Sequence, residues 1–188
     1  MQSLLASVRL TIVTMAICVA GYAALIWAIG QVFTPETAGA SLLRSDDGTI
    51  IGSRQIAQNF TEPRYFWPRP SAVDYNAAAA GGSNKSPVSA DLRKRAGEIV
   101  ARYGATADTP LPPELAAASG AGLDPHISEH AARYQARRVA EARGIPVAAV
   151  EKHIAEGSFS PGWFLTPDRL VNVLELNLAL DRMAATGQ

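Results

Sequence analysis

Metal binding is the first chemistry that residue types and spacing suggest, because His126 and His130 stand four residues apart. A zinc site needs three or four ligands, and no third ligand is placed beside these two. Nucleophilic catalysis has no better support: no serine lies in a nucleophile elbow, and the one cysteine, Cys18, falls in an apolar stretch. The sequence therefore predicts no catalytic residue and no metal centre.

A glycine-rich stretch, GGSNKS at residues 81–86, resembles a phosphate-binding loop. A Walker A loop needs glycine immediately before its Lys-Ser pair, and Asn84 stands there instead. Without that glycine the backbone cradle for phosphate is absent. A tight turn-rich loop is the simpler interpretation, which leaves Gly81, Gly82, Ser83 and Asn84 only as weak candidates for nucleotide contact.

Four arginines on a predicted helix–glycine–helix segment raise the alternative of a DNA-binding helix-turn-helix. Acidic residues interleave with them, and the whole chain has 17 basic and 17 acidic side chains, for a formal net charge of zero. A DNA-binding surface needs a net basic patch, so we interpret these positions as a solvated face and expect no nucleic-acid partner. The arginines are Arg133, Arg137, Arg138 and Arg143; the acidic residues are Glu129, Glu141 and Glu151.

Charge is missing from one long run near the N-terminus, residues 10–35. As a helix, the roughly 24 residues of Leu10–Phe33 would rise about 36 Å, enough to cross a hydrocarbon core about 30 Å thick. Lipid offers the backbone no hydrogen-bond partners, so the segment must be helical, and the proline at position 35 ends it. We predict a transmembrane helix over residues 10–33, after a tail of residues 1–9.

A cleaved signal peptide and a buried core helix are the alternatives to this anchor. Ala38-Gly39-Ala40 has the small residues of a cleavage site. The apolar core of a signal peptide is about 7–15 residues long, and this run is much longer. We therefore interpret the span as a retained anchor, which a mature chain beginning at Ser41 would contradict.

Small residues recur every four positions within the predicted span: Ala16, Ala20, Ala24 and Ala28, with Gly21 beside them. Small side chains let a second helix approach closely, and packing drives helix association in lipid. Alanine is common throughout this chain, so chance is the alternative to a helix-packing face.

Charge alone does not decide the orientation of the span, because Arg9 precedes it and Arg44 follows it. The free amino group tips the balance slightly toward a cytoplasmic N-terminus. We therefore expect a single-pass membrane protein, with residues 34–188 forming an extracytoplasmic domain.

The fold class expected for residues 34–188 is one compact α+β domain, mainly helical in its C-terminal half. Leu42–Ile51 reads as a hairpin that turns at Asp47-Gly48. Helices are predicted from Ser89 to Gly104, from Ser128 to Arg143 and from Pro146 to Gly157, with a Pro/Ala/Gly linker over residues 105–122. A last helix is capped by Asn172, with Glu175 at the third helical position, and its apolar surface predicts a central place in the core.

The segment Asn59–Ser71 combines aromatic residues with three prolines, which exclude a helix interior or a central strand. The aromatic side chains of Tyr65, Phe66 and Trp67 need a surface that removes them from water. Two alternatives stay open: the segment folds onto the domain's own core, or the aromatic residues form a surface for a partner.

The order of these segments resembles the C subunit of the bacterial Kdp high-affinity potassium-transporting ATPase. The similarity covers nearly the whole chain. The stretches that carry it are GSRQIAQNF, YFWPRPS, YNAAAAGGSN, SGAGLDPHIS and VNVLELNLALD, of which the last is the most specific.

This resemblance implies a non-catalytic subunit of a P-type ATPase complex, which assembles and stabilises that complex. Its partners would be a pore-forming potassium-binding subunit, an ATP-hydrolysing subunit and a small single-span subunit, within the lipid bilayer. The complex would handle ATP and K⁺, and this chain would bind no cofactor tightly. The candidate partner contacts are Tyr65, Phe66, Trp67, Arg69 and Ser71, with the small-residue face of the span packing on another subunit.

The family resemblance also implies a catalytic chaperone that raises the ATP affinity of the hydrolysing subunit. That role is tied to a glutamine ahead of a glycine-rich stretch, and no glutamine stands just ahead of the matching residues 78–83. An extracytoplasmic domain would not meet cytoplasmic ATP, so we expect an indirect effect through a shared conformational equilibrium. The remaining alternatives are an anchored envelope binding domain without an ATPase partner and a cytoplasm-facing nucleotide-binding regulator.

Overall fold

The structure is a computed structural model that describes residues 2–45, 47–162 and 168–186. The chain divides into two compact units, one ending at Ile51 and one beginning at Gly52. One long apolar helix belongs to the first unit, and the second is an α+β unit with a small sheet. This architecture confirms the predicted fold class.

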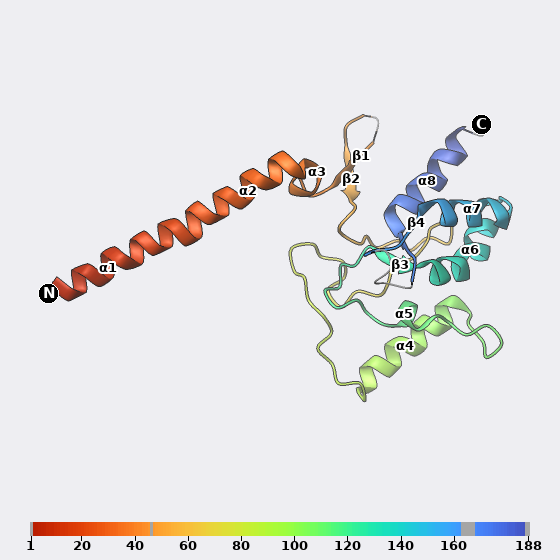
Figure 1. Cartoon of the computed structure of the whole chain (residues 1–188). Coiled ribbons are helices and arrows are strands. Elements are labelled where there is room, and N and C mark those ends of the chain that lie inside the picture. The colour runs from red at the N-terminus through yellow and green to blue at the C-terminus, as the bar shows by residue number, and fades with distance from the viewer. Residues whose placement is uncertain (1, 46, 163–167, 187–188) are drawn as a thin grey trace. The chain divides into compact units, whose positions relative to one another are not determined.

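The N-terminal unit consists mainly of one continuous helix over Gln2–Phe33, drawn as the red-to-orange rod in Figure 1. It comprises α1 (Gln2–Met15), a π-helical segment (Ala16–Gly21) and α2 (Tyr22–Phe33). The helix is long and apolar enough to cross a membrane, and none of it is buried within the chain. It begins eight residues before the predicted span, because nothing in residues 2–9 breaks a helix, and it ends at the predicted place.

The π-helical segment changes how the small residues of the span line up. The backbone N–H of Tyr22 reaches the carbonyl of Ile17, five residues earlier. In an α-helix a turn holds 3.6 residues, so four residues make slightly more than one turn and each residue is rotated past the residue four positions before it. A π-type turn holds more residues, so over four residues it rotates less than a full turn and offsets the extra rotation of the α-helix. The turn therefore keeps Ala16 and Ala20 closer to the line of Ala24 and Ala28 than an unbroken α-helix would.

A short helix and a hairpin complete the N-terminal unit. Helix α3 (Pro35–Ala38) is followed by β1 (Leu42–Arg44) and β2 (Ile50–Ser53), which form a two-stranded sheet. Gly48 in the connection has a φ of 83°, which glycine adopts without strain. The predicted hairpin is confirmed, with its second strand ending two residues later than expected, at Ser53.

The C-terminal unit is built around a three-stranded antiparallel sheet in the order β3 (His126–Ser128), β5 (Leu170–Asn172) and β4 (Ser158–Phe159). Ile127 and Ser158 both pair with Val171 of the middle strand. The sequence did not reveal these strands, because two or three residues are too few to show the alternation typical of a strand.

Three helices pack with this sheet: α6 (Glu129–Arg143), α7 (Val147–Gly157) and α8 (Val173–Thr186), which lie together in the blue and cyan part of Figure 1. The Ser128 hydroxyl accepts a hydrogen bond from the Ala131 N–H at the start of α6, and Asn172 Oδ1 accepts one from the Glu175 N–H at the start of α8. These caps confirm the predicted helix starts. The buried core includes Phe66, Leu115, Ile127, Val139, Val150, Ile154, Val171, Leu176 and Leu180.

Helix α4 (Ala90–Tyr103) lies at the edge of this unit and contributes no fully buried residue. Its predicted N-cap, Ser89, has the extended backbone of a cap, but its side chain makes no capping hydrogen bond. The predicted linker after α4 contains the one-turn helix α5 (Pro113–Ala116), which buries Leu115. One inward-facing residue on so short a turn leaves no periodic signal, which is why the sequence did not predict it.

Candidate functional site

The aromatic loop, Asn59–Ser71, is held against α6 and α8 by two buried side-chain amides. Asn177 Oδ1 accepts a hydrogen bond from the Phe66 N–H (2.8 Å), and Asn177 Nδ2 donates to the Phe66 carbonyl (3.1 Å). Gln135 holds Trp67 in the same way, at 2.9 and 3.1 Å. Each amide supplies the donor and acceptor that a neighbouring strand would offer. A proline-rich loop that cannot join a sheet thereby has its buried backbone groups satisfied.

Trp67 lies between two guanidinium groups. The Cζ atoms of Arg102 and Arg138 lie 3.8 and 3.7 Å from its ring centroid. Two groups this close to the centroid do not fit on one face, so they cover opposite faces as cation–π contacts. Tyr103 packs edge-on against the same ring, and Trp67 Nε1 donates to the Glu62 carbonyl (3.0 Å). The ring is therefore enclosed within the unit.

Burial affects the ionisation of the groups around this ring. It lowers the pKa of Arg138 to about 10, so the guanidinium still carries its charge at neutral pH. Burial also raises the pKa of Tyr103 and of Tyr75. The cation–π contacts therefore persist throughout the physiological pH range.

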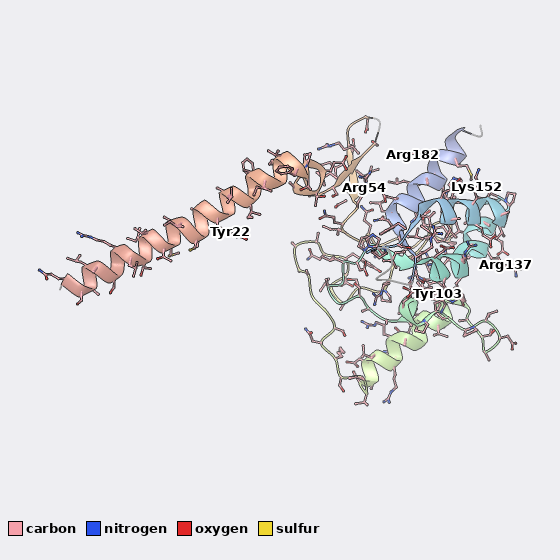
Figure 2. The ribbon with its side chains drawn as sticks, viewed as in Figure 1. Tyr22, Arg54, Tyr103, Arg137, Lys152 and Arg182 are labelled. Atoms are coloured by element: carbon pink, nitrogen blue, oxygen red, sulfur yellow. The ribbon has the colours of Figure 1, made fainter. Side chains whose placement is uncertain are left out.

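The structure corrects the interpretation of the four arginines of α6 as one solvated face. Arg133 and Arg137 do face outward and pair with glutamates one turn away on α6, and Arg137 extends from the surface in Figure 2. Arg138 instead donates to the carbonyls of Pro63 (2.6 Å) and Tyr65 (3.0 Å). Arg143 turns inward as well, and its Nε donates to the Arg64 carbonyl (2.7 Å). Unpaired loop carbonyls, which no local sequence pattern reveals, attract these two arginines.

The aromatic loop's contact with α6 and α8 is one junction between distant parts of the chain. A second junction is formed where the glycine-rich stretch packs against residues 118–124. The Gly81 N–H donates to the Ala121 carbonyl (2.9 Å), so it does not point freely toward a ligand. A Cβ on Gly82 would lie 2.8 Å from the Gly120 carbonyl oxygen, which shows how closely the two backbones approach. Ser83 is half-buried, and Asn84 is exposed with a φ of 50°. The backbone of this stretch therefore packs on the chain itself at Gly81 and Gly82.

Arg69 and Ser71 also use their polar groups within the chain. Arg69 pairs with Asp124 (3.4 Å) and donates to the Ala118 carbonyl (3.4 Å). The Ser71 hydroxyl accepts hydrogen bonds from two backbone N–H groups that follow it, those of Val73 (3.1 Å) and Tyr75 (2.9 Å). Both side chains therefore shape the end of the aromatic loop.

The five predicted partner contacts thus differ in accessibility. Phe66 and Trp67 are buried, which matches the alternative in which the loop folds onto its own core. Tyr65, Arg69 and Ser71 are half-buried. Any partner that approaches this loop therefore meets a surface that Phe66 and Trp67 support from beneath.

The sequence did not predict which residues hold the aromatic loop in place. These residues are Gln135, Arg138, Arg143, Asn177 and Asp181. A polar side chain inside an apolar helical face is the sequence signal that could have revealed the two amides. Gln135 precedes the inward-facing Ala136, and Asn177 follows the buried Leu176.

Asp124 provides a pH test of the second junction. Burial alone would raise the pKa of this carboxyl, but hydrogen bonds from His126 and the charge of Arg69 lower it below its ordinary value of 3.8. A lowered folded-state pKa stabilises the fold above the ordinary pKa, and that stabilisation disappears as the pH falls through the lowered value. We expect the stability gap between wild type and Asp124→Asn, measured by urea unfolding in mild detergent, to narrow below about pH 4. A gap that is constant from pH 7 to pH 3 would contradict this assignment.

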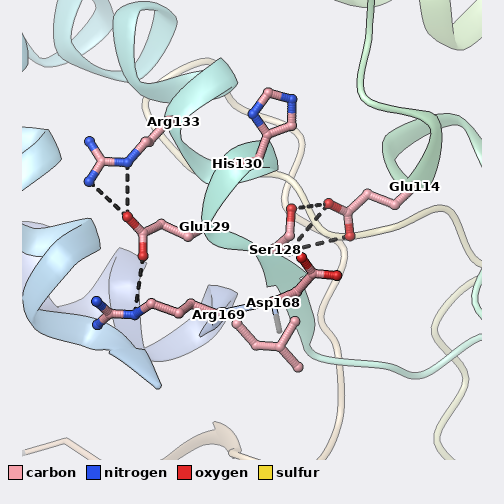
Figure 3. Close-up of a pocket in the computed structure, with 8 residues that line it drawn as sticks. Glu114, Ser128, Glu129, His130, Arg133, Asp168 and Arg169 are labelled. Carbon is pink, nitrogen blue, oxygen red and sulfur yellow. Dashed lines mark hydrogen bonds and ion pairs between the residues drawn. The ribbon is translucent and has the colours of Figure 1, made fainter. Parts of the chain in front are cut away.

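A cavity of about 750 Å³ lies where α6 begins and is shown in Figure 3. Glu129 bridges Arg133 (2.8 Å) and Arg169 (3.3 Å) across it, and the hydrogen bond from Arg133 lowers the pKa of Glu129. Glu114 accepts hydrogen bonds from the Ser128 hydroxyl and backbone N–H. Glu129 is thus shared by two arginines, and the Glu114 carboxylate is held by the residue that caps α6.

The two histidines of the metal hypothesis have different surroundings. The His126 ring packs against Phe159 and lies 3.3 Å from Asp124, whereas His130 is exposed beside the cavity. Among the residues that the structure describes, no three His, Cys, Asp or Glu side chains are placed to hold a metal ion.

Comparison with known proteins gives one consistent result. Residues 4–182 match the family described as "KdpC: K+-transporting ATPase, c chain". A potassium-transporting ATPase KdpC subunit of Parvibaculum lavamentivorans is 69% identical over the full length of both chains. Proteins of the same description from Trichlorobacter lovleyi (41% identical, 97% of this chain and 99% of the relative) and Shewanella putrefaciens (40%, 100% and 95%) are also similar. The chain therefore belongs to the KdpC family and is a subunit of a potassium-transporting ATPase complex, not the subunit that hydrolyses ATP.

Proposed function

We propose that the chain assembles and stabilises a high-affinity potassium uptake complex as its membrane-anchored, non-hydrolytic subunit. The observation that carries this proposal is the internal use of polar groups in the C-terminal unit. The amides of Gln135 and Asn177 and the inward-facing arginines hold the unit's own loops in place. Such an arrangement makes a rigid surface for neighbouring subunits.

The partners that fit this role are a pore-forming potassium-binding subunit, the ATP-hydrolysing P-type subunit and a small single-span subunit. The helix Gln2–Phe33 would lie in the lipid bilayer beside their helices. The π-helical turn supports the proposed packing face, because it keeps the small residues closer to one line.

The packing face can be tested with bulkier side chains. We expect the double variant Ala20→Leu/Ala24→Leu to lower the yield of co-purified partner subunits at least about tenfold, because leucine blocks close helix approach in lipid. The control is Ala23→Leu, which adds one leucine side chain one position away from Ala24 and should leave the yield near wild type. Equal yields from both variants would contradict the proposed face.

We infer that any effect of this chain on ATP affinity is indirect. Support comes from the Gly81 N–H, which donates within the chain, and from the packing of Gly82 against the Gly120 carbonyl. The test compares complexes purified with and without this chain, by the ATP concentration that gives half-maximal hydrolysis. Omission should raise that concentration several-fold, while an ATP analogue that labels the hydrolysing subunit should leave this chain unlabelled. An unchanged concentration would contradict the chaperone role, and labelling of this chain would contradict the indirect one.

The proposed location is the cell inner membrane, with the N-terminus in the cytoplasm and the C-terminal unit outside. A cysteine placed at the exposed Ser160, in a Cys18→Ser background, reports the topology. A membrane-impermeant thiol reagent should label it in intact cells once the outer membrane is permeabilised. Labelling only after the inner membrane is broken would place the unit in the cytoplasm.

A further inference from the structure

Arg143, at the end of α6, has a buried guanidinium group with unused hydrogen-bond donors. Its side chain is only 5% exposed. Nε donates to the Arg64 carbonyl, and Nη2 lies 2.9 Å from Asp181 Oδ1 as an ion pair. Neither Nη1 nor Nη2 makes a hydrogen bond with the described part of the chain. Buried charged donors are normally satisfied, so Nη1, which also lacks an ion pair, points to a missing acceptor.

A pocket of about 170 Å³ lies directly beside this group. Arg143 and Arg64 line it together with apolar side chains from the end of α6, the following turn and the last turns of α8. These apolar residues are Ala142, Ile145, Leu180, Met183 and Ala184. The pocket thus combines a cationic wall with an apolar wall, in a space that suits a few non-hydrogen atoms.

The charge around the pocket favours an anion. Arg64 and Arg143 contribute two positive charges, and Asp181, which lies 3.4 Å from Arg64, contributes one negative charge. Asp181 also accepts a hydrogen bond from the Tyr65 hydroxyl (3.3 Å), which occupies part of its accepting capacity. One positive charge is left over, on guanidinium groups whose forked geometry matches a carboxylate.

We propose that this pocket binds the carboxylate of an Asp or Glu side chain from a neighbouring subunit. The apolar wall formed by Ile145, Leu180 and Met183 suits the methylene groups of such a side chain, whereas a free, strongly hydrated anion would gain nothing from it. The proposal rests on the proposed function for its partner. The pocket is lined by residues of α6 and α8 and by Arg64 of the aromatic loop, so binding there would couple a subunit contact to that loop.

Propionate is a suitable probe, because it carries a carboxylate on a two-carbon apolar chain. The full chain in detergent micelles is titrated at pH 7 and followed by backbone amide NMR shifts of Ile145 and Ala184. We expect saturable, millimolar binding to wild type, and loss of binding in Ala184→Leu, which fills the pocket from an exposed helix position. The matched control Ala148→Leu, at an exposed position of α7, should bind as wild type does.

The direction in which a second variant changes the affinity for propionate separates binding from a merely structural role. Asp181→Asn removes the negative charge that competes for Arg143, so propionate should bind at least about threefold more tightly. Unchanged or weaker binding in this variant, or the absence of saturable shifts in wild type, would overturn the proposal. Inorganic phosphate binding more tightly than propionate would also overturn it, by identifying a site for a free anion.

The final test compares how well the variants co-purify with their partner subunits. Ala184→Leu should reduce the yield of co-purified partner subunits several-fold relative to Ala148→Leu. If wild type itself co-purifies no partner while propionate still binds, the proposed function fails and the carboxylate site stands. If wild type assembles and both variants assemble equally well, the assignment of a partner carboxylate fails and the proposed function stands.

Discussion

Replacing Asn177 with alanine is expected to lower the free energy of unfolding of the C-terminal unit by about 4 kcal/mol. The side chain is 1% exposed and satisfies both the N–H and the carbonyl of Phe66. A buried polar group left without a partner destabilises a fold by about 1–3 kcal/mol, and this change leaves two such groups. Urea unfolding of the full chain in mild detergent, followed by circular dichroism, measures the difference.

Asn59→Ala is the matched control, because Asn59 lies in the same loop but its side chain is exposed. Its unfolding free energy should stay within about 0.5 kcal/mol of wild type. Equal effects of the two variants would mean that Asn177 does not hold the loop. The buried amide would then have no role in positioning Phe66.

Replacing Gly122 with alanine is expected to lower the unfolding free energy by at least about 3 kcal/mol, because strain and steric clash combine. Gly122 has a φ of +70°, and a Cβ there would lie 2.6 Å from Val73 Cγ2 and 3.0 Å from both the Gly81 carbonyl oxygen and Ser71 Oγ. The backbone oxygen cannot move without separating the glycine-rich stretch from residues 118–124. The same urea titration in detergent measures this effect.

Gly144 offers a control in which the strain occurs without the clash. It has a φ of +67°, and no atom lies within 4 Å of a Cβ built there. Gly144→Ala should therefore lower the unfolding free energy by only about 1–2 kcal/mol, the effect of a left-handed conformation alone. A Gly122→Ala variant no less stable than Gly144→Ala would show that the close approach at the second junction is not required.

In the C-terminal unit, neighbouring loops are held in place by a few buried groups. Asn177 and Gln135 hold the aromatic loop, while Gly122 permits the second junction, and Ser71 lies where the two meet. A subunit that supports an assembly needs a surface of fixed shape, because ordering a flexible surface on binding opposes association. The internal hydrogen bonds provide that fixed shape before any partner arrives.

The sequence by itself determined the elements whose signals are local. The apolar run sets the long N-terminal helix, and Gly48 marks the hairpin turn. Ser128 and Asn172 mark the starts of α6 and α8, because a cap involves residues only three positions apart.

Only the tertiary structure decided how the aromatic loop is used. Gln135 contacts Trp67 across 68 positions of sequence, and Asn177 contacts Phe66 across 111. The strands of the three-stranded sheet leave no local sequence pattern either, since Ile127 pairs with Val171 across a stretch of chain that contains α6 and α7. A hydrogen bond between distant residues depends on where the whole chain places its helices, whereas caps, turns and apolar runs depend on neighbours already fixed by the covalent backbone.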